Sequence, residues 1–126
     1  MESKKVKVLI IEDDSFLLRM YADKFEIENF KVFIADEGKK GLRVAQKELP
    51  DIILLDIILP GMNGFEILKE LKANQTTEKI PVILLTNLSQ RDDVDQGLTL
   101  GAKDYLIKAH FMPSEVVAKV KNILNK

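Results

Sequence analysis

Four polar stretches of this 126-residue chain carry side chains that could do chemistry together. Each stretch lies at or directly after the end of a short β-branched apolar run: Glu12, Asp13 and Asp14; Asp56; Thr86; and Lys108. Carboxylate oxygens suit a hard divalent cation, while a hydroxyl and an ammonium group suit the oxygens of a phosphoryl group. The residue types therefore predict a site that holds a divalent cation and a phosphoryl group.

The carboxylates would repel one another without a counter-ion. Two unit charges about 4 Å apart repel by roughly 4 kcal/mol at an effective dielectric constant near 20. Mg²⁺ is the expected ion, because it prefers oxygen ligands, keeps several waters and bridges carboxylates to phosphate oxygens. Lys108 would add a second positive charge beside the same oxygens.

Five short runs are predicted to be strands, because they are nearly continuously apolar, as in a parallel sheet covered on both faces. They are residues 6–11, 31–35, 52–56, 82–86 and 105–108. The stretches between them are long enough for crossover helices and carry helical spacing of apolar residues. Strand followed by helix, five times over, predicts right-handed crossovers and a doubly wound open α/β sheet. The carboxyl ends of such strands meet at one edge, where ligands bind.

Capping residues mark the ends of the predicted helices. Asp14 or Ser15 is the expected N-cap of the first helix, and Asn63 is that of the third. Residues 89–92 resemble a capping box, so the fourth helix is expected to begin there and to run to about Gly101.

Composition narrows the class of protein. The chain has 19 basic and 20 acidic residues and a net charge of −1, so its overall charge favours neither nucleic acid nor an anionic membrane. It has no cysteine, which excludes disulfides, thiolate catalysis and cysteine metal sites. No apolar run approaches the roughly 20 residues of a membrane span, and the N-terminus does not resemble a signal peptide. We expect one cytoplasmic domain over residues 1–126, with a core at about 5–124.

Taken together, the motifs resemble those of a response-regulator receiver domain of two-component signalling over nearly the whole chain. They are IIEDD after the first strand, DIILPGMNG from Asp56, LLTN at the end of the fourth strand and GAKDYLIKA around the fifth. Each motif alone is weak evidence for the family, whereas all four in this order are specific to it. The resemblance implies a flavodoxin-like (βα)5 fold with five parallel strands in the order 2-1-3-4-5.

The resemblance also implies the roles of the acidic residues. Asp56 would accept a phosphoryl group from a phosphohistidine on a histidine kinase or a histidine phosphotransfer protein. Asp13, Asp56 and the backbone carbonyl of Ile58 would bind Mg²⁺, with Glu12 acting through a water molecule. Asp14 follows the acidic pair of the family and is interpreted as a helix cap.

Three further residues would bind the phosphoryl group or respond to it. The resemblance implies that Lys108 pairs with its oxygens and that Thr86 bonds to one of them. Tyr105 occupies the switch position, where the ring turns inward as the threonine moves. Partner binding would change at the face formed by the fourth helix, fifth strand and fifth helix, and the effector is unknown. We expect a monomer or a weak phosphorylation-dependent dimer, without direct binding to nucleic acid or membrane.

The sequence departs from the family pattern at Ala109 and Asn87, and Ile58 lies at a position where the family varies. Ala109 follows Lys108, where the family usually has a proline in a cis bond; cis before alanine would cost about 2.5 to 4 kcal/mol, so trans and strained cis both stay open. Asn87 follows Thr86, where the family has a small residue, and would either narrow access to the site or add a hydrogen bond. With Ile58 at this position, we expect the phosphoryl group on Asp56 to be hydrolysed more slowly than with a polar residue there.

The first helix has more apolar positions than one buried stripe can use. They are Phe16, Leu17, Leu18, Met20, Tyr21, Ala22 and Phe25. One hypothesis is that the surplus docks the phosphodonor; extended burial and harmless exposure are the alternatives.

Two other functions stay open at this point. A Mg²⁺-dependent phosphohydrolase of the haloacid dehalogenase type also uses an aspartate nucleophile, but it normally carries a second aspartate where Ile58 stands. An interaction-only receiver that never accepts phosphate is the other alternative, which Asn87 and Ala109 keep open. The single histidine, His110, is interpreted as a surface residue.

Overall fold

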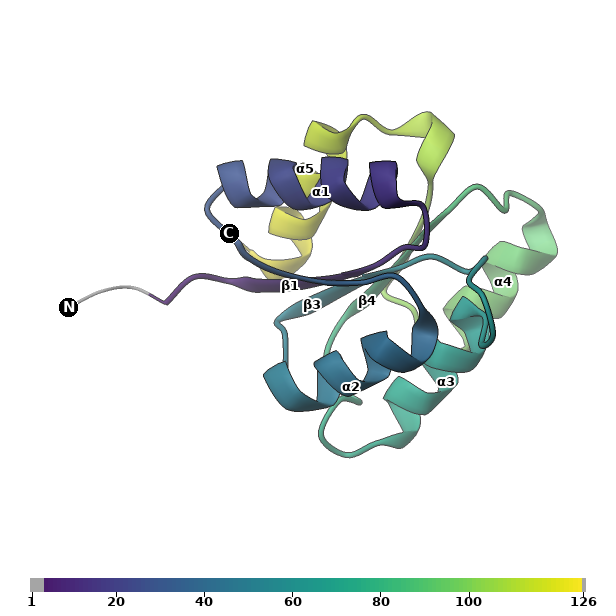
Figure 1. The fold of residues 1–126 in the computed structure, drawn as a ribbon. Helices are drawn as coiled ribbons and strands as arrows, with labels where there is room; N and C mark the ends of the chain where they lie inside the picture. Colours follow the sequence, from purple (N-terminus) through teal and green to yellow (C-terminus); the bar gives the residue numbers. More distant parts are fainter. Residues whose placement is uncertain (1–3, 126) are drawn as a thin grey trace.

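The computed structural model describes residues 4–125, so residues 1–3 and 126, the outer ends of the predicted domain, lie outside the described residues. Strands and α-helices alternate along the chain, as predicted (Figure 1). The elements are β1 (Lys7–Ile11), α1 (Ser15–Ile27), β2 (Lys31–Ala35), α2 (Gly38–Glu48), β3 (Ile52–Leu55), α3 (Gly64–Ala73), β4 (Val82–Thr86), α4 (Arg91–Thr99), β5 (Asp104–Ile107), the 3₁₀ helix η1 (Lys108–His110) and α5 (Pro113–Leu124). Within residues 4–125, each helix is too short or too polar to cross a lipid bilayer.

The strands form one parallel sheet in the order β2-β1-β3-β4-β5, which confirms the predicted fold class and strand order. The chain runs outward from β1 to β2 and then returns across β1 to β3. The order therefore reverses between β1 and β3, and a crevice is expected outside their carboxyl ends. Glu12 directly follows β1 and Asp56 directly follows β3, so both acids lie at this switch point.

Helices cover both faces of the sheet. Helices α1 and α5 lie on one face, while α2, α3 and α4 lie on the other (Figure 1). One core layer joins the first pair of helices to the sheet through residues such as Phe25 and Val116, and the second is built on the other face around Ile67 and Leu68. Full burial of each large aliphatic side chain contributes about 1.5 to 3 kcal/mol, so the two layers hold the strand ends in place.

The prediction that all five strands are buried on both faces is wrong for the edge strands β2 and β5, and in β5 only Leu106 is buried. The residues of β1, β3 and β4 are almost all buried, whereas β2 exposes Lys31 and Ile34. The reason is that β2 and β5 lie at the edges of the sheet, where β2 pairs only with β1 and β5 only with β4. Lysine on an edge strand also discourages pairing with another chain.

Two predicted helix caps are confirmed and one is wrong. Asp14 caps α1, since its Oδ1 accepts a hydrogen bond from Leu17 N at 3.0 Å, and Asn63 caps α3 in a capping box. The capping box predicted at residues 89–92 does not form. Helix α4 begins at Arg91 after Gln90, whose backbone is extended (φ −72°, ψ 147°), so Ser89 stands one residue too early to cap it.

Strands β3 and β5 end earlier than predicted. Asp56 follows the last residue of β3, and Lys108 opens η1 after β5 ends at Ile107. The β4–β5 ladder stops at the pair Thr86 and Ile107, so the backbone beyond that point is free to turn. As a result, Asp56 and Lys108 stand in the loops that line the crevice.

Candidate functional site

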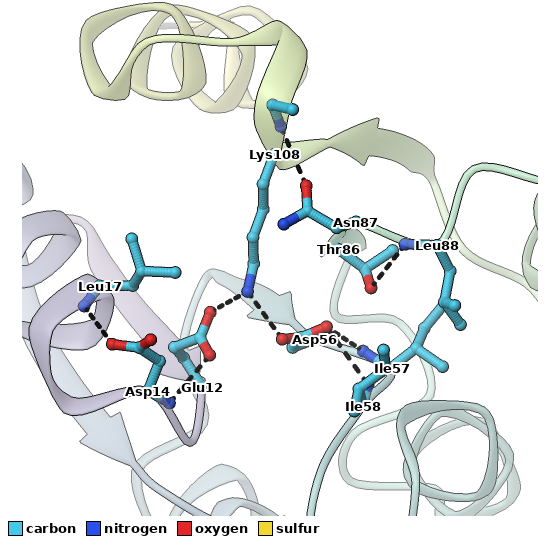
Figure 2. A network of polar contacts seen from close by, with 11 residues as sticks. Glu12, Asp14, Leu17, Asp56, Ile57, Ile58, Thr86, Asn87, Leu88 and Lys108 are labelled. Carbon is cyan, nitrogen blue, oxygen red and sulfur yellow. Dashed lines mark hydrogen bonds and ion pairs between the residues drawn. The ribbon is translucent and has the colours of Figure 1, made fainter.

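The site lies at the carboxyl ends of β1, β3, β4 and β5, and each strand supplies part of it (Figure 2). The loop after β1 carries the acids at positions 12–14, and the loop after β3 carries Asp56. Strand β4 ends in Thr86, while Lys108 reaches in from η1. The predicted residues therefore come from four segments that are far apart in sequence and meet only in the folded sheet.

Glu12, Asp13 and Asp56 each offer a carboxylate oxygen, and these oxygens lie within 4.8 Å of one another. Glu12 and Asp56 are 3% and 6% exposed, whereas Asp13 faces solvent. Two buried carboxylates and one exposed carboxylate make an oxygen-only donor set, which suits a hard divalent cation such as Mg²⁺. The acidic cluster therefore fits the predicted ion.

Lys108 lies between the two buried acids. Its Nζ donates a hydrogen bond to Asp56 Oδ2 at 2.7 Å and forms an ion pair with Glu12 Oε1 (Figure 2). Burial acts to lower the pKa of the lysine, but the hydrogen bonds to Asp56 and Glu12 outweigh it, so the pKa of Lys108 is raised. The ammonium group therefore stays charged at neutral pH and faces the carboxylates of Asp56 and Glu12.

Glu12, Asp13 and Asp56 bring three carboxylates to the site, which the ammonium group of Lys108 alone does not balance. Burial raises the pKa of Glu12, and the nearby Asp56 raises it further, although Lys108 and the backbone of Asp14 oppose the change. Its Oε2 accepts a hydrogen bond from Asp14 N at 3.0 Å, which holds the turn after β1. The site therefore holds excess negative charge, for which a further cation would compensate.

Hydrogen bonds orient the Asp56 carboxylate. Its Oδ1 accepts from Ile57 N at 2.7 Å and from Ile58 N at 3.3 Å, while Oδ2 faces Lys108. Helix α3 begins against the same backbone, since a Cβ on Gly64 would clash with the carbonyl oxygen of Asp56. Only glycine permits this approach, so residue 64 fixes the turn that presents Asp56.

Thr86 and Tyr105 meet the same loop residue. The buried Thr86 hydroxyl accepts a hydrogen bond from Leu88 N at 3.4 Å, and the Tyr105 hydroxyl donates one to Leu88 O at 2.7 Å. Burial raises the pKa of Tyr105 to about 12, so its hydroxyl is protonated at neutral pH. The loop between β4 and α4 therefore connects the predicted threonine to the predicted switch tyrosine.

Two residues take part in the site in ways that the sequence did not specify. Asn87 Oδ1 accepts a hydrogen bond from Ala109 N at 3.1 Å, which resolves the open choice for Asn87 in favour of a hydrogen bond. Tyr21, assigned only to the apolar face of the first helix, lines a narrow pocket with Glu12 and Asp56, and burial raises its pKa. The sequence signal that could have pointed to Tyr21 was its polar hydroxyl within an otherwise apolar stripe of the first helix.

Three exposed apolar side chains belong to segments that adjoin the site residues in the sequence. Phe16, Ile58 and Met112 are 74%, 58% and 67% exposed, and they belong to α1, the loop after β3 and the loop before α5. The expectation that part of the apolar surplus of α1 faces solvent is therefore confirmed at Phe16. Docking of a phosphodonor there stays a prediction, as do metal binding by the Ile58 carbonyl and a water-mediated role for Glu12.

Comparison with known proteins identifies the same arrangement elsewhere. Residues 8–121 match the family model of the response regulator receiver domain. The chain is 40% identical to the response regulator ArlR of Staphylococcus saprophyticus over 95% of this chain and 53% of that protein. It is 42% identical to the response regulator PleD of Caulobacter vibrioides over 81% of this chain and 22% of that protein. It thus spans about half or less of these relatives' length.

A solved structure agrees with the sequence comparisons. The crystal structure of a putative response regulator from Chloroflexus aurantiacus superposes with a TM-score of 0.89 at 32% identity, covering 98% of this chain and 100% of that one. The fold is therefore shared with that protein over nearly the whole chain.

Proposed function

Since this chain belongs to the family of response-regulator receiver domains, which are phosphorylation-controlled signalling domains and not conventional enzymes, we propose that Asp56 is its phosphoryl acceptor. The observation that carries the proposal is the contact of Asp56 with Lys108, beside two further carboxylates. The donor would be a phosphohistidine on a histidine kinase or a histidine phosphotransfer protein.

The proposed transfer of the phosphoryl group is a nucleophilic substitution at phosphorus. A carboxylate oxygen of Asp56 forms the new P–O bond while the P–N bond of the phosphohistidine breaks, and the imidazole leaves with the electron pair. The product is an acyl phosphate on Asp56. Lys108 and the N–H groups of Ile57 and Ile58 stand where they would stabilise negative charge on the oxygens around the reacting atoms. Catalysis would rest on positioning and charge neutralisation.

Glu12, Asp13 and Asp56 would hold Mg²⁺, with the Ile58 carbonyl as a further ligand and Glu12 acting through a water molecule. When bound, the ion neutralises phosphoryl charge and the mutual repulsion of the carboxylates. The excess of three carboxylates over the one ammonium group of Lys108 supports this assignment. Lys108 supplies the fixed positive charge of the site.

Thr86 and Tyr105 would convert the modification into a change of partner binding. A phosphoryl oxygen would accept a hydrogen bond from the Thr86 hydroxyl, whose oxygen also accepts one from Leu88 N, and the carbonyl of Leu88 accepts the hydrogen bond of Tyr105. A shift of this loop would alter the surface of α4, β5 and α5. The downstream effector and the oligomeric state stay predictions.

The central test is incubation with Mg²⁺ and acetyl phosphate, followed by intact mass measurement. We expect one phosphoryl adduct on the wild type and none on Asp56→Asn. Asp14→Asn is the matched control, since asparagine also caps helices and Asp14 is assigned no phosphoryl role. An unmodified wild type, or equal modification of Asp56→Asn, would contradict the proposal. Release of many phosphates per protein would indicate a phosphohydrolase instead.

A further inference from the structure

The backbone connection between β4 and β5 stops just before the site. The last pair in the parallel ladder is Thr86 with Ile107. Beyond it, the side chain of Asn87 continues the connection, because its Oδ1 accepts a hydrogen bond from Ala109 N at 3.1 Å (Figure 2). One side-chain hydrogen bond thus joins the two loops that carry Thr86 and Lys108.

This hydrogen bond needs both residue types. An asparagine side chain offers a carbonyl acceptor, and Ala109 offers a backbone N–H that proline at this position would lack. Within the described residues 4–125 no peptide bond is cis, so Lys108 and Ala109 are joined in trans. The two positions at which the sequence departs from the receiver pattern around Thr86 and Lys108 are therefore the two ends of one contact.

The segment held by this contact has little regular structure of its own. Helix η1 spans three residues, and it is followed by a single-turn bond from Phe111 N to Lys108 O at 3.3 Å. Lysine has a long side chain with many rotamers, and the position of its backbone decides which of them can bring the ammonium group to Asp56 and Glu12. The Asn87 bond restrains the backbone one residue after the Lys108 Cα.

Resting on the proposed function of Asp56, we propose that Asn87 is a positioning residue for the phosphoryl chemistry. Its amide oxygen holds the Ala109 backbone and so keeps the Lys108 ammonium against the carboxylates of Asp56 and Glu12. Because Asn87 directly follows Thr86, the same bond ties the threonine loop to the lysine loop. Asn87 does not touch the reacting atoms and acts through Lys108.

Two substitutions separate positioning from simple access to the site. Asn87→Leu keeps the approximate size of the side chain but removes the acceptor, and Asn87→Ala removes both. We expect both to slow modification of Asp56 by acetyl phosphate and Mg²⁺ by about three- to tenfold, the range expected for one net hydrogen bond. If Asn87 instead only narrows access, Asn87→Ala reacts faster and Asn87→Leu reacts as wild type, which would overturn the proposal.

A second readout does not depend on reactivity. In the unphosphorylated protein without divalent cations, Asn87→Leu should accelerate hydrogen exchange of the Ala109 amide measured by NMR.

A double-mutant cycle tests whether Asn87 acts through Lys108. The effect of Asn87→Leu on the rate of Asp56 modification should disappear in a Lys108→Ala background, because coupled residues are non-additive. A full rate effect in that background, or unchanged Ala109 exchange, would overturn positioning through Lys108.

The wild type separates failure of this inference from failure of the proposed function. If wild type and Asn87→Leu are modified at the same rate, the positioning role is wrong and Asp56 is still the acceptor. If the wild type takes no phosphoryl group, the proposed function is wrong and the positioning role falls with it.

Discussion

Lys108 Nζ lies 2.7 Å from Asp56 Oδ2, although 52 residues separate the two in the sequence. The side chains of Lys108 and Asp56 are only 10% and 7% exposed. Taking such a pair out of water costs free energy that its attraction scarcely repays, so a buried pair is weak evidence for a stabilising role. Its place beside Glu12 is better explained by the charge that phosphoryl transfer would require at this point.

Removal of the lysine should leave buried carboxylates without their cation. We expect Lys108→Ala to lower the free energy of unfolding at neutral pH, without divalent cations, towards the lower end of the about 3 to 5 kcal/mol that a broken buried pair costs. Urea unfolding measures this loss, and Mg²⁺ should recover part of it by neutralising Glu12 and Asp56. Lys103→Ala is the exposed control, and equal stability of the two variants would contradict the expectation.

The contact of helix α3 with the loop that carries Asp56 should be intolerant of a methyl group. A Cβ on Gly64 would clash with Asp56 O and would lie 2.6 Å from Ile57 Cα, and both are backbone atoms that cannot rotate away. We expect Gly64→Ala to cost about 3 kcal/mol, at the upper end for overpacking, and to slow modification of Asp56. Gly61→Ala meets no atom within 4 Å and bears only the strain of its φ of +74°. It should therefore leave the reaction rate unchanged, and a matching loss of rate in both variants would argue against this contact.

The order of elements could be predicted because it depends on local patterns. Continuous apolar runs indicated central strands, and Asp14 and Asn63 indicated helix starts, since a cap acts on the next few residues only. The strand order came from the resemblance to the family. The cap at Ser89 was predicted wrongly because the loop after β4 extends to Gln90 before the helix begins.

The contacts of the site depended on loop geometry and were harder to predict. That Lys108 and Asp56 would converge followed from the strand ends, whereas the hydrogen bond from Ala109 to Asn87 required the path of η1. Tyr21 was hidden in an apolar stripe, and its approach to Glu12 depends on how α1 packs on the sheet. Side-chain partners far apart in sequence leave no local pattern.

An ion pair between Glu28, the C-cap residue of α1, and Lys121 of α5 should make stability depend on acid pH. Glu28 Oε1 accepts a hydrogen bond from Lys121 Nζ at 2.7 Å, and this bond lowers the pKa of Glu28 below its usual 4.5. A carboxyl group whose pKa is lowered by folding contributes stability above its pKa in the unfolded chain. This stability is lost as the pH falls through its pKa in the folded state. We expect Glu28→Gln to lower the thermal midpoint at pH 7 and to approach the wild-type midpoint as the pH falls below 4.5 and through the lowered pKa of Glu28. Glu26→Gln, on the exposed face of the same helix, is the control, and a pH-independent difference would refute the linkage.

The hydroxyl of Tyr105 should affect stability at alkaline pH. Its pKa is raised to about 12 by burial, above the 10.0 of an exposed tyrosine. Because the ionised form is disfavoured in the fold, stability should fall as the pH rises from about 10 towards 12. Tyr105→Phe should flatten this fall, although it loses about 1 kcal/mol at neutral pH with the hydrogen bond to Leu88 O. Unfolding measured at several pH values tests this, and an equally steep alkaline decline in the variant would count against it.

Ile58 should influence how long a phosphoryl group stays on Asp56. Its backbone N–H bonds Asp56 Oδ1, and its side chain is exposed beside the site, where it offers an attacking water no hydrogen bond. The Ile58→Asn variant would keep the backbone contact and offer an amide to that water, so phosphoryl loss should be about three- to tenfold faster, the effect of one hydrogen bond. Ile27→Asn replaces an equally apolar, exposed side chain in the last turn of α1 and should leave the lifetime unchanged. The decay of the phosphorylated mass after removal of acetyl phosphate measures the lifetime. Equal decay of wild type and Ile58→Asn would show that the apolar side chain does not limit attack by water.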